Sequence, residues 1–297
     1  MSSDKAQELT KTINESIATL CAETDAAKQS QTYKAWLNTV SRFHHYSFGN
    51  QILIWCQSPE ATRVAGFHTW KSLDRSVKKG EHGIRILAPI VRKVEEERNG
   101  KTEEVIRPVS FRVVSVFDIS QTEGEPLPDL ECNATHGGEN LLPLLERAVT
   151  GLNISLTYKP LSGPDGLSKG GAIEIEETLD TAARCGVIAH ELSHELLGHA
   201  ARRAETTKQQ RELEAESVSY AVLSHFGMNP QSQFYLATYD ITAEMLTASL
   251  QTINATAKRI IGLLSQDGDS QEEGKGSAGY SGTPARAFAQ EEMTVAA

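Results

Sequence analysis

The stretch VIAHELSHEL, residues 187–196, decides how the rest of this chain is interpreted. It contains His190-Glu191-x-x-His194, and residues four apart on a helix point only about 40° from each other around the axis. Both histidines could therefore direct a ring nitrogen at one zinc ion, and Glu191 could reach a water on that metal. Apolar residues at helical spacing, uninterrupted by Pro or Gly, predict a helix here, and Gly198 is expected to end it.

A third metal ligand is expected from a second helix, because a catalytic zinc usually has three protein ligands and one open position. Residues 212–223 predict such a helix. Glu214 shares an apolar face with Val218 at helical spacing, whereas Glu212 and Glu216 share a face that we expect to be solvated. Burying a carboxylate without a partner is costly, so Glu214 is predicted as the third ligand, with Glu212 and Glu216 as weaker choices.

Two histidines four apart could also be ordinary surface residues of a helix. The carboxylates on the downstream helix favour a metal site. The order of the motif, with Glu214 twenty positions after His194, resembles the gluzincin class of metallopeptidases. In particular it is similar to the ImmA/IrrE-like zincins of bacteria and mobile elements. The stretch YSFGNQILIW, residues 46–55, resembles the signature of the ArdC-type single-stranded-DNA-binding domain. Together the two stretches resemble the ArdC antirestriction family over roughly residues 30–262.

This resemblance implies a mobile-element protein that protects incoming DNA from host restriction. It implies Zn²⁺ as cofactor, a protein substrate, and Glu191 as the group that takes a proton from water and delivers it to the leaving amine. In zincins an edge strand beside the metal-binding helix pairs with an extended substrate, a role that would fall to Ala172–Glu176. A hairpin that only covers the helix fits the alternation of these residues equally well. Some gluzincins place an acid four residues after the ligand Glu, where this chain has Val218.

Length and composition indicate a folded protein of two domains. The chain has 297 residues, of which 39% are hydrophobic and 23% charged. It has no run of about 18 apolar residues, so no membrane span is predicted, and its start resembles no secretory signal. Four scattered cysteines argue against disulfides and thiolate zinc sites, which favours the reducing cytoplasm.

The predicted fold class is α+β, with a different mixture of elements in each domain. Residues 1–125 form a DNA-binding domain, in which three longer helices and a short one precede a β-hairpin. The hairpin strands are expected at residues 83–91 and 109–117, and Asn99-Gly100 is a strong turn signal. Residues 126–139 are rich in Gly and Pro and are predicted to be a linker.

Residues 140–265 are predicted to form a zincin-like domain, with a small sheet packed on the helix that carries the histidines. A helix over residues 140–150 and strands at 154–158 and 172–176 precede that helix. A short helix at residues 234–239 and a long one at 245–264 follow the second metal helix. Residues 266–297 contain little apolar content and are predicted to be a disordered tail.

The charge of the chain is unevenly distributed. The net charge is −10, yet residues 34–93 contain ten basic and three acidic residues, a local charge of +7. Aromatic residues lie between these cations, and a cationic groove with stacking platforms is what a single strand requires. The predicted DNA contacts are Lys71, Arg75, Lys78, Lys79, Arg85, Trp70 and Phe48. Single-stranded DNA bound without sequence preference is the expected partner, with duplex DNA as a second, and no membrane.

Three alternatives stay open at this stage. The cations could be a solvated face and the aromatic residues part of the core. The zinc site could be a structural element of a pure DNA-binding protein, or the chain could be a regulatory protease that cleaves a repressor. The residues that could stabilise an oxyanion opposite the zinc are Tyr220, Tyr235, Tyr239 and His225, and no spacing selects one of them.

Overall fold

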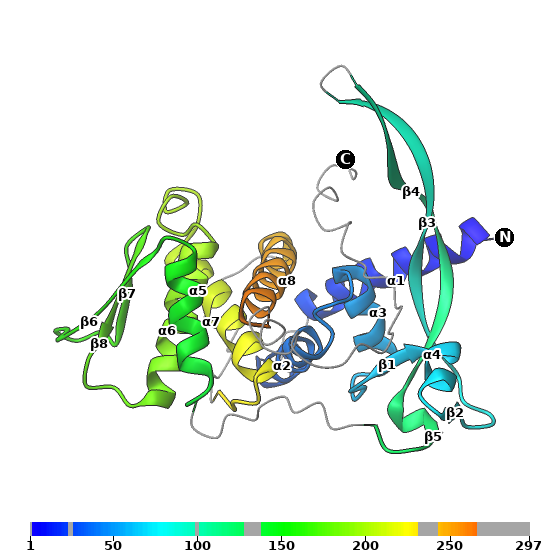
Figure 1. The fold of residues 1–297 in the computed structure, drawn as a ribbon, viewed down its shortest axis with the longest axis horizontal. Helices are drawn as coiled ribbons and strands as arrows, with labels where there is room; N and C mark the ends of the chain where they lie inside the picture. Colours follow the sequence, from blue (N-terminus) through cyan, green and yellow to red (C-terminus); the bar gives the residue numbers. More distant parts are fainter. Residues whose placement is uncertain (1, 23–25, 99–100, 128–137, 231–242, 266–297) are drawn as a thin grey trace, which may run out of the picture. The chain divides into compact units, whose positions relative to one another are not determined.

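A computed structural model describes residues 2–22, 26–98, 101–127, 138–230 and 243–265. Its helices and small sheets confirm the α+β class (Figure 1). The first part of the chain contains α1 (Ser2–Ala22), α2 (Ala26–Arg42), α3 (Phe48–Gln57), β1 (Val64–Gly66), α4 (Phe67–Ser72), β2 (Arg75–Val77), β3 (Ile84–Arg98), β4 (Lys101–Asp118), the 3-10 turn η1 (Ile119–Gln121) and β5 (Thr122–Gly124). The four predicted helices are therefore present, and β5 lies close to the start of the predicted linker.

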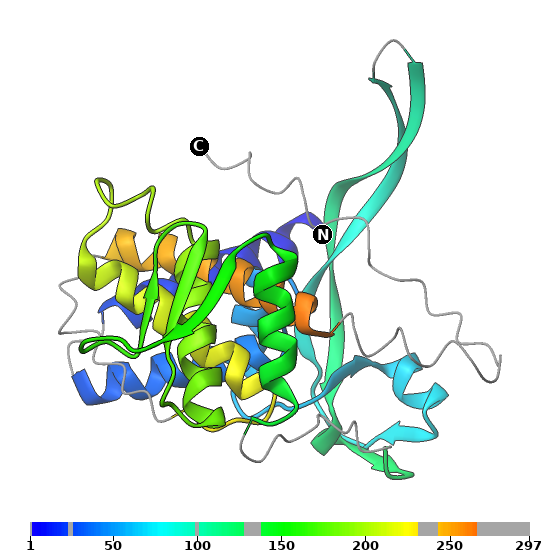
Figure 2. The ribbon, with the colours of Figure 1, turned by 60° about the vertical axis from the view of Figure 1, so that its left-hand side comes forward.

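The predicted hairpin is present and is much longer than the sequence pattern indicated. β3 and β4 pair antiparallel from Ile84↔Val116 out to Arg98↔Lys101, with a register shift between Ile90 and Val91. The predicted turn residues Asn99 and Gly100 lie outside the described residues. In Figures 1 and 2 the outer part of this hairpin extends away from the helices. At its inner end β1 pairs with β4, and β2 pairs with β5 in a separate two-stranded sheet.

The second part of the chain builds a small sheet against a group of helices. It contains α5 (Leu141–Gly151), β6 (Ser155–Lys159), β7 (Gly166–Ser168), β8 (Ala172–Glu176), α6 (Thr181–Leu196), α7 (Lys208–His225) and α8 (Ala243–Ser265). The strand order is β6-β8-β7, with β8 parallel to β6 and antiparallel to β7. Ile173 and Ile175 of β8 are fully buried in the same core as Ile188 and Leu192 of α6, so the sheet packs on α6. The predicted helix at residues 234–239 and tail at 266–297 lie outside the described residues.

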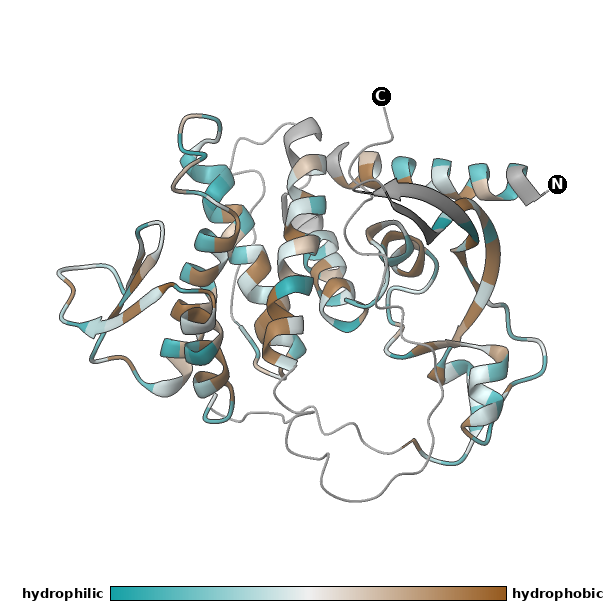
Figure 3. Cartoon of the chain, turned by 45° about the horizontal axis from the view of Figure 1, so that its top comes forward, coloured by the Kyte–Doolittle hydropathy of each residue, from teal (hydrophilic) through white to brown (hydrophobic). Residues whose placement is uncertain are grey.

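One core joins the two parts that the sequence separated. The larger cluster of buried residues contains Tyr33, Trp36 and Leu37 of α2 together with Val218 and other residues of α5 to α8. The hydroxyl groups of Tyr33 and Ser217 are 2.9 Å apart, and Tyr220 donates a hydrogen bond to Asn38 at 2.9 Å. Residues 1–264 form one compact unit, and a second, smaller cluster of buried residues lies within the first part alone, between Leu9 and Val116. Figure 3 shows hydrophobic and hydrophilic positions alternating along these helices, as a shared core requires.

The ArdC-like stretch at residues 46–55 has a structural role in this fold. Asn50 of α3 bonds the backbone of Leu87 twice, since its Nδ2 donates to the carbonyl oxygen at 2.8 Å and its Oδ1 accepts from the amide at 2.9 Å. Two turns later, Gln57 forms the same pair with the backbone of Arg85 at 2.9 and 3.0 Å. The two carboxamides thus satisfy the edge of β3 as a neighbouring strand would, which fixes the base of the hairpin on α3.

Candidate functional site: a metal centre on α6 and α7

Helix α6 carries the His-Glu-x-x-His residues, and the chain reverses direction directly after it. Asp180 caps its first turn by accepting a hydrogen bond from the Ala183 amide at 2.8 Å. At the other end Gly198 has φ +66°, and the amides of Gly198 and His199 donate to the carbonyl oxygens of Glu195 and His194 at 3.1 Å each. This double bond pattern with a left-handed glycine is a Schellman motif. The predicted end of the helix at Gly198 is confirmed, and the motif returns His199 to the side of His194.

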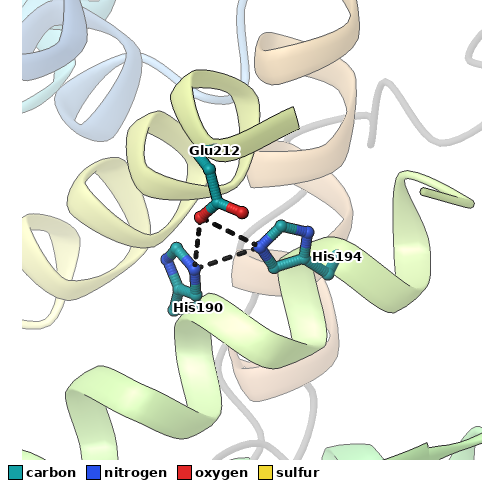
Figure 4. Close-up of side chains that lie close together, drawn as sticks. All are labelled: His190, His194 and Glu212. Carbon is teal, nitrogen blue, oxygen red and sulfur yellow. Dashed lines mark hydrogen bonds and ion pairs between the residues drawn. The ribbon is translucent and has the colours of Figure 1, made fainter. Parts of the chain in front are cut away.

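Two histidines and one carboxylate converge at the surface between α6 and α7 (Figure 4). The Nε2 atoms of His190 and His194 are 3.0 Å apart. One oxygen of Glu212 lies 3.6 Å from the first and 3.7 Å from the second. Ligand atoms around a tetrahedral zinc are separated by about 3.3 Å, given metal–ligand distances of about 2 Å. The three atoms therefore have the chemistry and the spacing of a site for one divalent cation.

The predicted third ligand, Glu214, does not lie at this site. Its side chain is 1% exposed and points into the core. There it accepts hydrogen bonds from Gln210 Nε2 at 3.0 Å and Ser249 Oγ at 2.6 Å, and its other oxygen lies 3.0 Å from His199 Nε2. Side chains two positions apart on a helix point about 200° from each other around its axis. Glu212 therefore faces away from Glu214, toward α6. The apolar face of α7 packs inside the protein, and the half-exposed face supplies the candidate ligand.

Each histidine ring is held through its second nitrogen. His190 Nδ1 lies 3.2 Å from Glu216. Glu216 follows Glu212 by four residues, so with Glu212 as the ligand the chain does have an acid four residues after it. With Glu214 as the ligand, that position would be Val218. His194 Nδ1 lies 2.7 Å from His199 Nδ1, and His199 Nε2 in turn contacts Glu214. Such outer contacts fix the orientation of metal-binding imidazoles. Glu216 and the His199–Glu214 pair thus hold the two histidine rings in place of an acid at position 218.

Glu191 lies beside the histidines in a confined position. A Cβ atom on Gly166 of β7 would approach its Cγ to 2.9 Å and its Oε1 to 3.0 Å, so the strand runs directly against this carboxylate. Burial raises the pKa of Glu191, although the charges of His190 and His194 oppose the shift. A raised pKa is expected of a group that accepts and returns a proton near neutral pH.

Glu195 fastens the strand β7 and the following turn to α6. It accepts hydrogen bonds from Ser168 Oγ at 2.6 Å, from the Gly170 amide at 2.8 Å and from the Gly171 amide at 2.6 Å. This role of the residue directly after His194 was not predicted. The prediction that Ala172–Glu176 is an edge strand is wrong, because this strand, β8, is paired on both sides. The edge strand that lies on α6 beside Glu191 is β7.

Charge pairing is strong among the side chains of the site. Burial tends to lower the pKa of His190, but hydrogen bonds with Glu212 and Glu216 raise it to about 9. The bonds to His190 and His194 hold the pKa of Glu212 well below its usual range. Glu212 is therefore anionic, which suits a divalent cation in place of the imidazole proton.

Of the four residues considered for oxyanion stabilisation, the structure describes two, and both have contacts with α2. Tyr220 donates a hydrogen bond to Asn38 of α2, and His225 Nδ1 lies 2.8 Å from the Ser41 carbonyl oxygen of the same helix. Tyr235 and Tyr239 lie outside the described residues.

The predicted DNA contacts divide into buried and exposed residues. Trp70 is 2% exposed and donates to the Phe117 carbonyl oxygen at 2.9 Å, so its ring cannot stack on a base. Phe48 is partly buried against the larger core, and the guanidinium of Arg75 is bonded to Thr122, Gly124 and Glu125. The three side chains thus have structural contacts in this fold, and a DNA contact at Phe48 or Arg75 stays a prediction. Lys71, Lys78, Lys79 and Arg85 are exposed, although Lys78 Nζ donates to the Ser120 carbonyl oxygen at 2.8 Å.

Two exposed aromatic rings were not among the predicted DNA contacts. Phe67, at the start of α4, is 51% exposed, and Phe111 of β4 is 39% exposed. No sequence signal distinguishes them from buried aromatic residues, because both lie in segments with alternating or mixed polarity.

Comparison with known proteins places the first part of the chain. Residues 3–117 match the model of the N-terminal domain of anti-restriction factor ArdC. An uncharacterised protein of Bacillus anthracis, pXO2-81, is 25% identical over 234 residues, which cover 65% of this chain and 40% of that protein. The chain thus spans about two fifths of the length of this curated relative.

Two crystal structures of the antirestriction ArdC protein from plasmid R388 are similar at low identity. The Mn(II)-bound structure has a TM-score of 0.47 and 19% identity and covers 89% of this chain and 99% of that one. The metal-free structure has a TM-score of 0.44 and 18% identity and covers 75% and 85%. The chain thus carries a domain of the ArdC N-terminal type at residues 3–117, and the family assignment covers that domain.

Proposed function

We propose that His190, His194 and Glu212 hold a divalent cation, zinc in the first instance, and that the site hydrolyses a peptide bond. The observation that carries this proposal is the convergence of three ligand atoms within 4.8 Å of one another beside the confined carboxylate of Glu191. A bound cation would polarise a carbonyl group and lower the pKa of a water molecule. Two imidazoles and a carboxylate leave a fourth position free for that purpose.

The residues around the site have distinct tasks in this reaction. Glu191, whose burial raises its pKa, accepts the proton of the attacking water and passes it to the leaving amine. Glu216 and His199 hold the rings of His190 and His194. Glu195 holds β7 against α6, and the free edge of β7 is where an extended peptide would pair.

The test compares the full chain with its Glu191→Gln variant, both loaded with Zn²⁺, on fluorescently labelled unfolded casein. Glu191→Gln should bind zinc as the parent does and lose hydrolysis by about 10²- to 10⁴-fold. Glu191→Gln that cleaves casein at the parental rate would refute the role of this residue. A parent chain that binds zinc tightly and cleaves nothing would support a structural zinc site instead.

A second proposed function is the binding of single-stranded DNA, which is supported by the ArdC N-terminal domain and by the local charge of residues 34–93. In combination, the two functions suit an antirestriction protein of a mobile element. No helix in the described residues is long and apolar enough to cross a membrane. The free thiols of Cys56 and Cys185 support a reducing compartment, the cytoplasm, as the place of action.

DNA binding is tested by anisotropy with labelled oligonucleotides and the full chain, at several salt concentrations. Binding to a single strand should weaken as salt rises, because each neutralised phosphate releases counterions. Absence of binding at low salt would refute this second function and leave the metal site untouched.

A further inference from the structure

Three histidine rings gather where α2 and α7 end. His44 and His45 lie in the turn between α2 and α3, and His225 is the last residue of α7. The ring centre of His44 lies 3.7 Å from that of His45 and 4.6 Å from that of His225. We call these three residues the histidine cluster. It shares no residue with the candidate metal centre, and it lies where α2 packs beside α7 (Figure 1).

The histidine cluster is not a second metal centre. Among the described residues, His190, His194 and Glu212 form a group whose ligand atoms lie within 4.8 Å of one another, and the cluster does not. The Nδ1 atom of His225 faces the Ser41 carbonyl oxygen at 2.8 Å. An imidazole nitrogen that faces a carbonyl oxygen carries a proton and has no lone pair for a metal. What these rings can take up is therefore a proton.

The surroundings of the cluster supply no negative charge for such a proton. α2 contributes the Ser41 carbonyl oxygen, and α8 contributes the ammonium group of Lys258, which acts on His44 and His45. No carboxylate is among the strongest influences on the pKa of the three rings. A charged ring would thus be next to other rings and Lys258 without a counterion, and like charges disfavour the charged form.

The turn that carries His44 and His45 is held against such repulsion. Gln51 of α3 is fully buried, and its Nε2 donates to the carbonyl oxygens of Phe43 and Tyr46 at 3.0 and 3.3 Å, one on each side of the two histidines. A buried carboxamide that loses its partners destabilises the fold. Repulsion within the cluster would therefore act on the contact of α2 with α7 and α8.

The pKa values of the three rings keep the cluster neutral near pH 7. Burial lowers the pKa of His44 to about 3, and the charges of His45, His225 and Lys258 act in the same direction. Burial also lowers the pKa of His45 and of His225. An unfolded chain binds protons on these rings near the ordinary histidine value of about 6.5, whereas the folded chain does so only at lower pH. The stability that depends on neutral rings is therefore complete above about pH 6.5 and is lost as the pH falls below it.

We propose that the histidine cluster is a pH-sensitive joint, which holds α2 on α7 and α8 while its rings are neutral and loosens this contact in mildly acidic solution. α2 belongs to the part of the chain that matches the ArdC N-terminal domain, and α7 carries Glu212 of the candidate metal centre. The joint therefore controls how firmly these two parts are packed together. The inference involves neither a metal nor DNA, so it does not depend on the proposed function.

Thermal melting of the full chain at pH 7.5 and at pH 5.5 gives the fall in Tm that acid causes. This fall should be smaller by about 3 °C in His44→Gln than in the parent, since one group no longer binds a proton on unfolding. In His225→Asn the amide can still donate to the Ser41 carbonyl oxygen, and the fall should be reduced in the same way. Folded His44→Gln and His225→Asn proteins whose Tm falls as far as that of the parent would overturn the proposal.

Two kinds of control accompany these variants. His82→Gln removes an exposed histidine just before β3 and should leave the fall in Tm unchanged. Lys258→Gln and Arg259→Gln remove the same charge from adjacent positions of α8, and only Lys258 is among the strongest influences on the cluster. Lys258→Gln should therefore reduce the fall more than Arg259→Gln does, and equal falls in these two proteins would count against the joint.

Hydrogen exchange of the parent chain locates the effect without any substitution. Protection factors, which correct for the intrinsic pH dependence of exchange, should decrease between pH 7.5 and pH 5.5 at the ends of α2 and α7, residues 37–42 and 220–225. The helix α5 should keep its protection. An equal decrease in α5, or no decrease at the two helix ends, would show that the cluster is an ordinary part of the core and no joint.

Discussion

At the residue scale, the outcome at Glu212 and Glu214 is the most instructive. The sequence argument held that a carboxylate on an apolar face must find a partner, and Glu214 does find partners. They are His199, Gln210 and Ser249 instead of a metal. Ser249 is 35 residues away on α8. That contact depends on the packing of α8 and could not be read from residue spacing. A buried carboxylate signals a partner without specifying which one.

His199 is predicted to position the metal site without touching the metal. Its ring lies between His194 Nδ1 and Glu214, at 2.7 and 3.0 Å. Because such contacts orient a ligand ring, His199→Gln should lower the affinity of the full chain for Zn²⁺ by about 10- to 100-fold. Competition with a chelating dye measures the affinity. His68→Gln, at an exposed histidine beside Phe67, is the matched control and should leave the affinity unchanged. Unchanged zinc affinity in a folded His199→Gln protein would rule out the positioning role.

At the element scale, the contact of β7 with α6 leaves no space for a side chain at Gly166. A Cβ atom there would lie 2.4 Å from Val187 Cγ1 and 2.9 Å from Glu191 Cγ. Gly166→Ala should therefore lower the free energy of unfolding by about 1–3 kcal/mol, as overpacking does, and should displace Glu191. Thermal or urea unfolding of the full chain measures the change.

Gly186 of α6 provides the control for this substitution, because a Cβ there meets nothing within 4 Å outside its own helix turn. Gly186→Ala should stabilise the chain by up to about 1 kcal/mol through helix propensity. Equal stability of the Gly166→Ala and Gly186→Ala proteins would mean that β7 does not press on α6 as described.

The sequence predicted elements well where local signals suffice and poorly where tertiary contacts decide. The histidine helix, its end at Gly198 and the pairing of β3 with β4 follow from periodicity and glycine conformation. The extra length of the hairpin does not, because its outer strands have mixed polarity with no alternating pattern. β7 has only three residues and is held by Glu195, so its place at the sheet edge required the structure.

At the scale of the whole molecule, the two predicted domains share a core. Tyr33, Trp36 and Leu37 of α2 are fully buried in the cluster that includes α7 and α8. A fragment of residues 1–125 would expose these side chains, each of which contributes about 2 kcal/mol or more when buried. We expect this fragment to lack a cooperative thermal transition, in contrast to the full chain, when both are followed by circular dichroism. A fragment that melts as sharply and at the same temperature as the full chain would show that the shared core contributes little.

The shared core also connects the two proposed functions physically. α2 and α3 support the base of the hairpin through Asn50 and Gln57, and α2 packs on α7, which carries Glu212. The full chain is therefore the proper material for both DNA and metal measurements.

The metal content of two glutamate variants tests the account most directly. Zinc bound per chain is measured by mass spectrometry of the metal after gel filtration of the parent, Glu212→Gln and Glu214→Gln proteins. One zinc per parent chain is expected, with loss of zinc from Glu212→Gln. Glu214→Gln should keep its zinc at reduced affinity, because it perturbs only the contact of His199. Full zinc in Glu212→Gln and none in a folded Glu214→Gln protein would contradict the site described here.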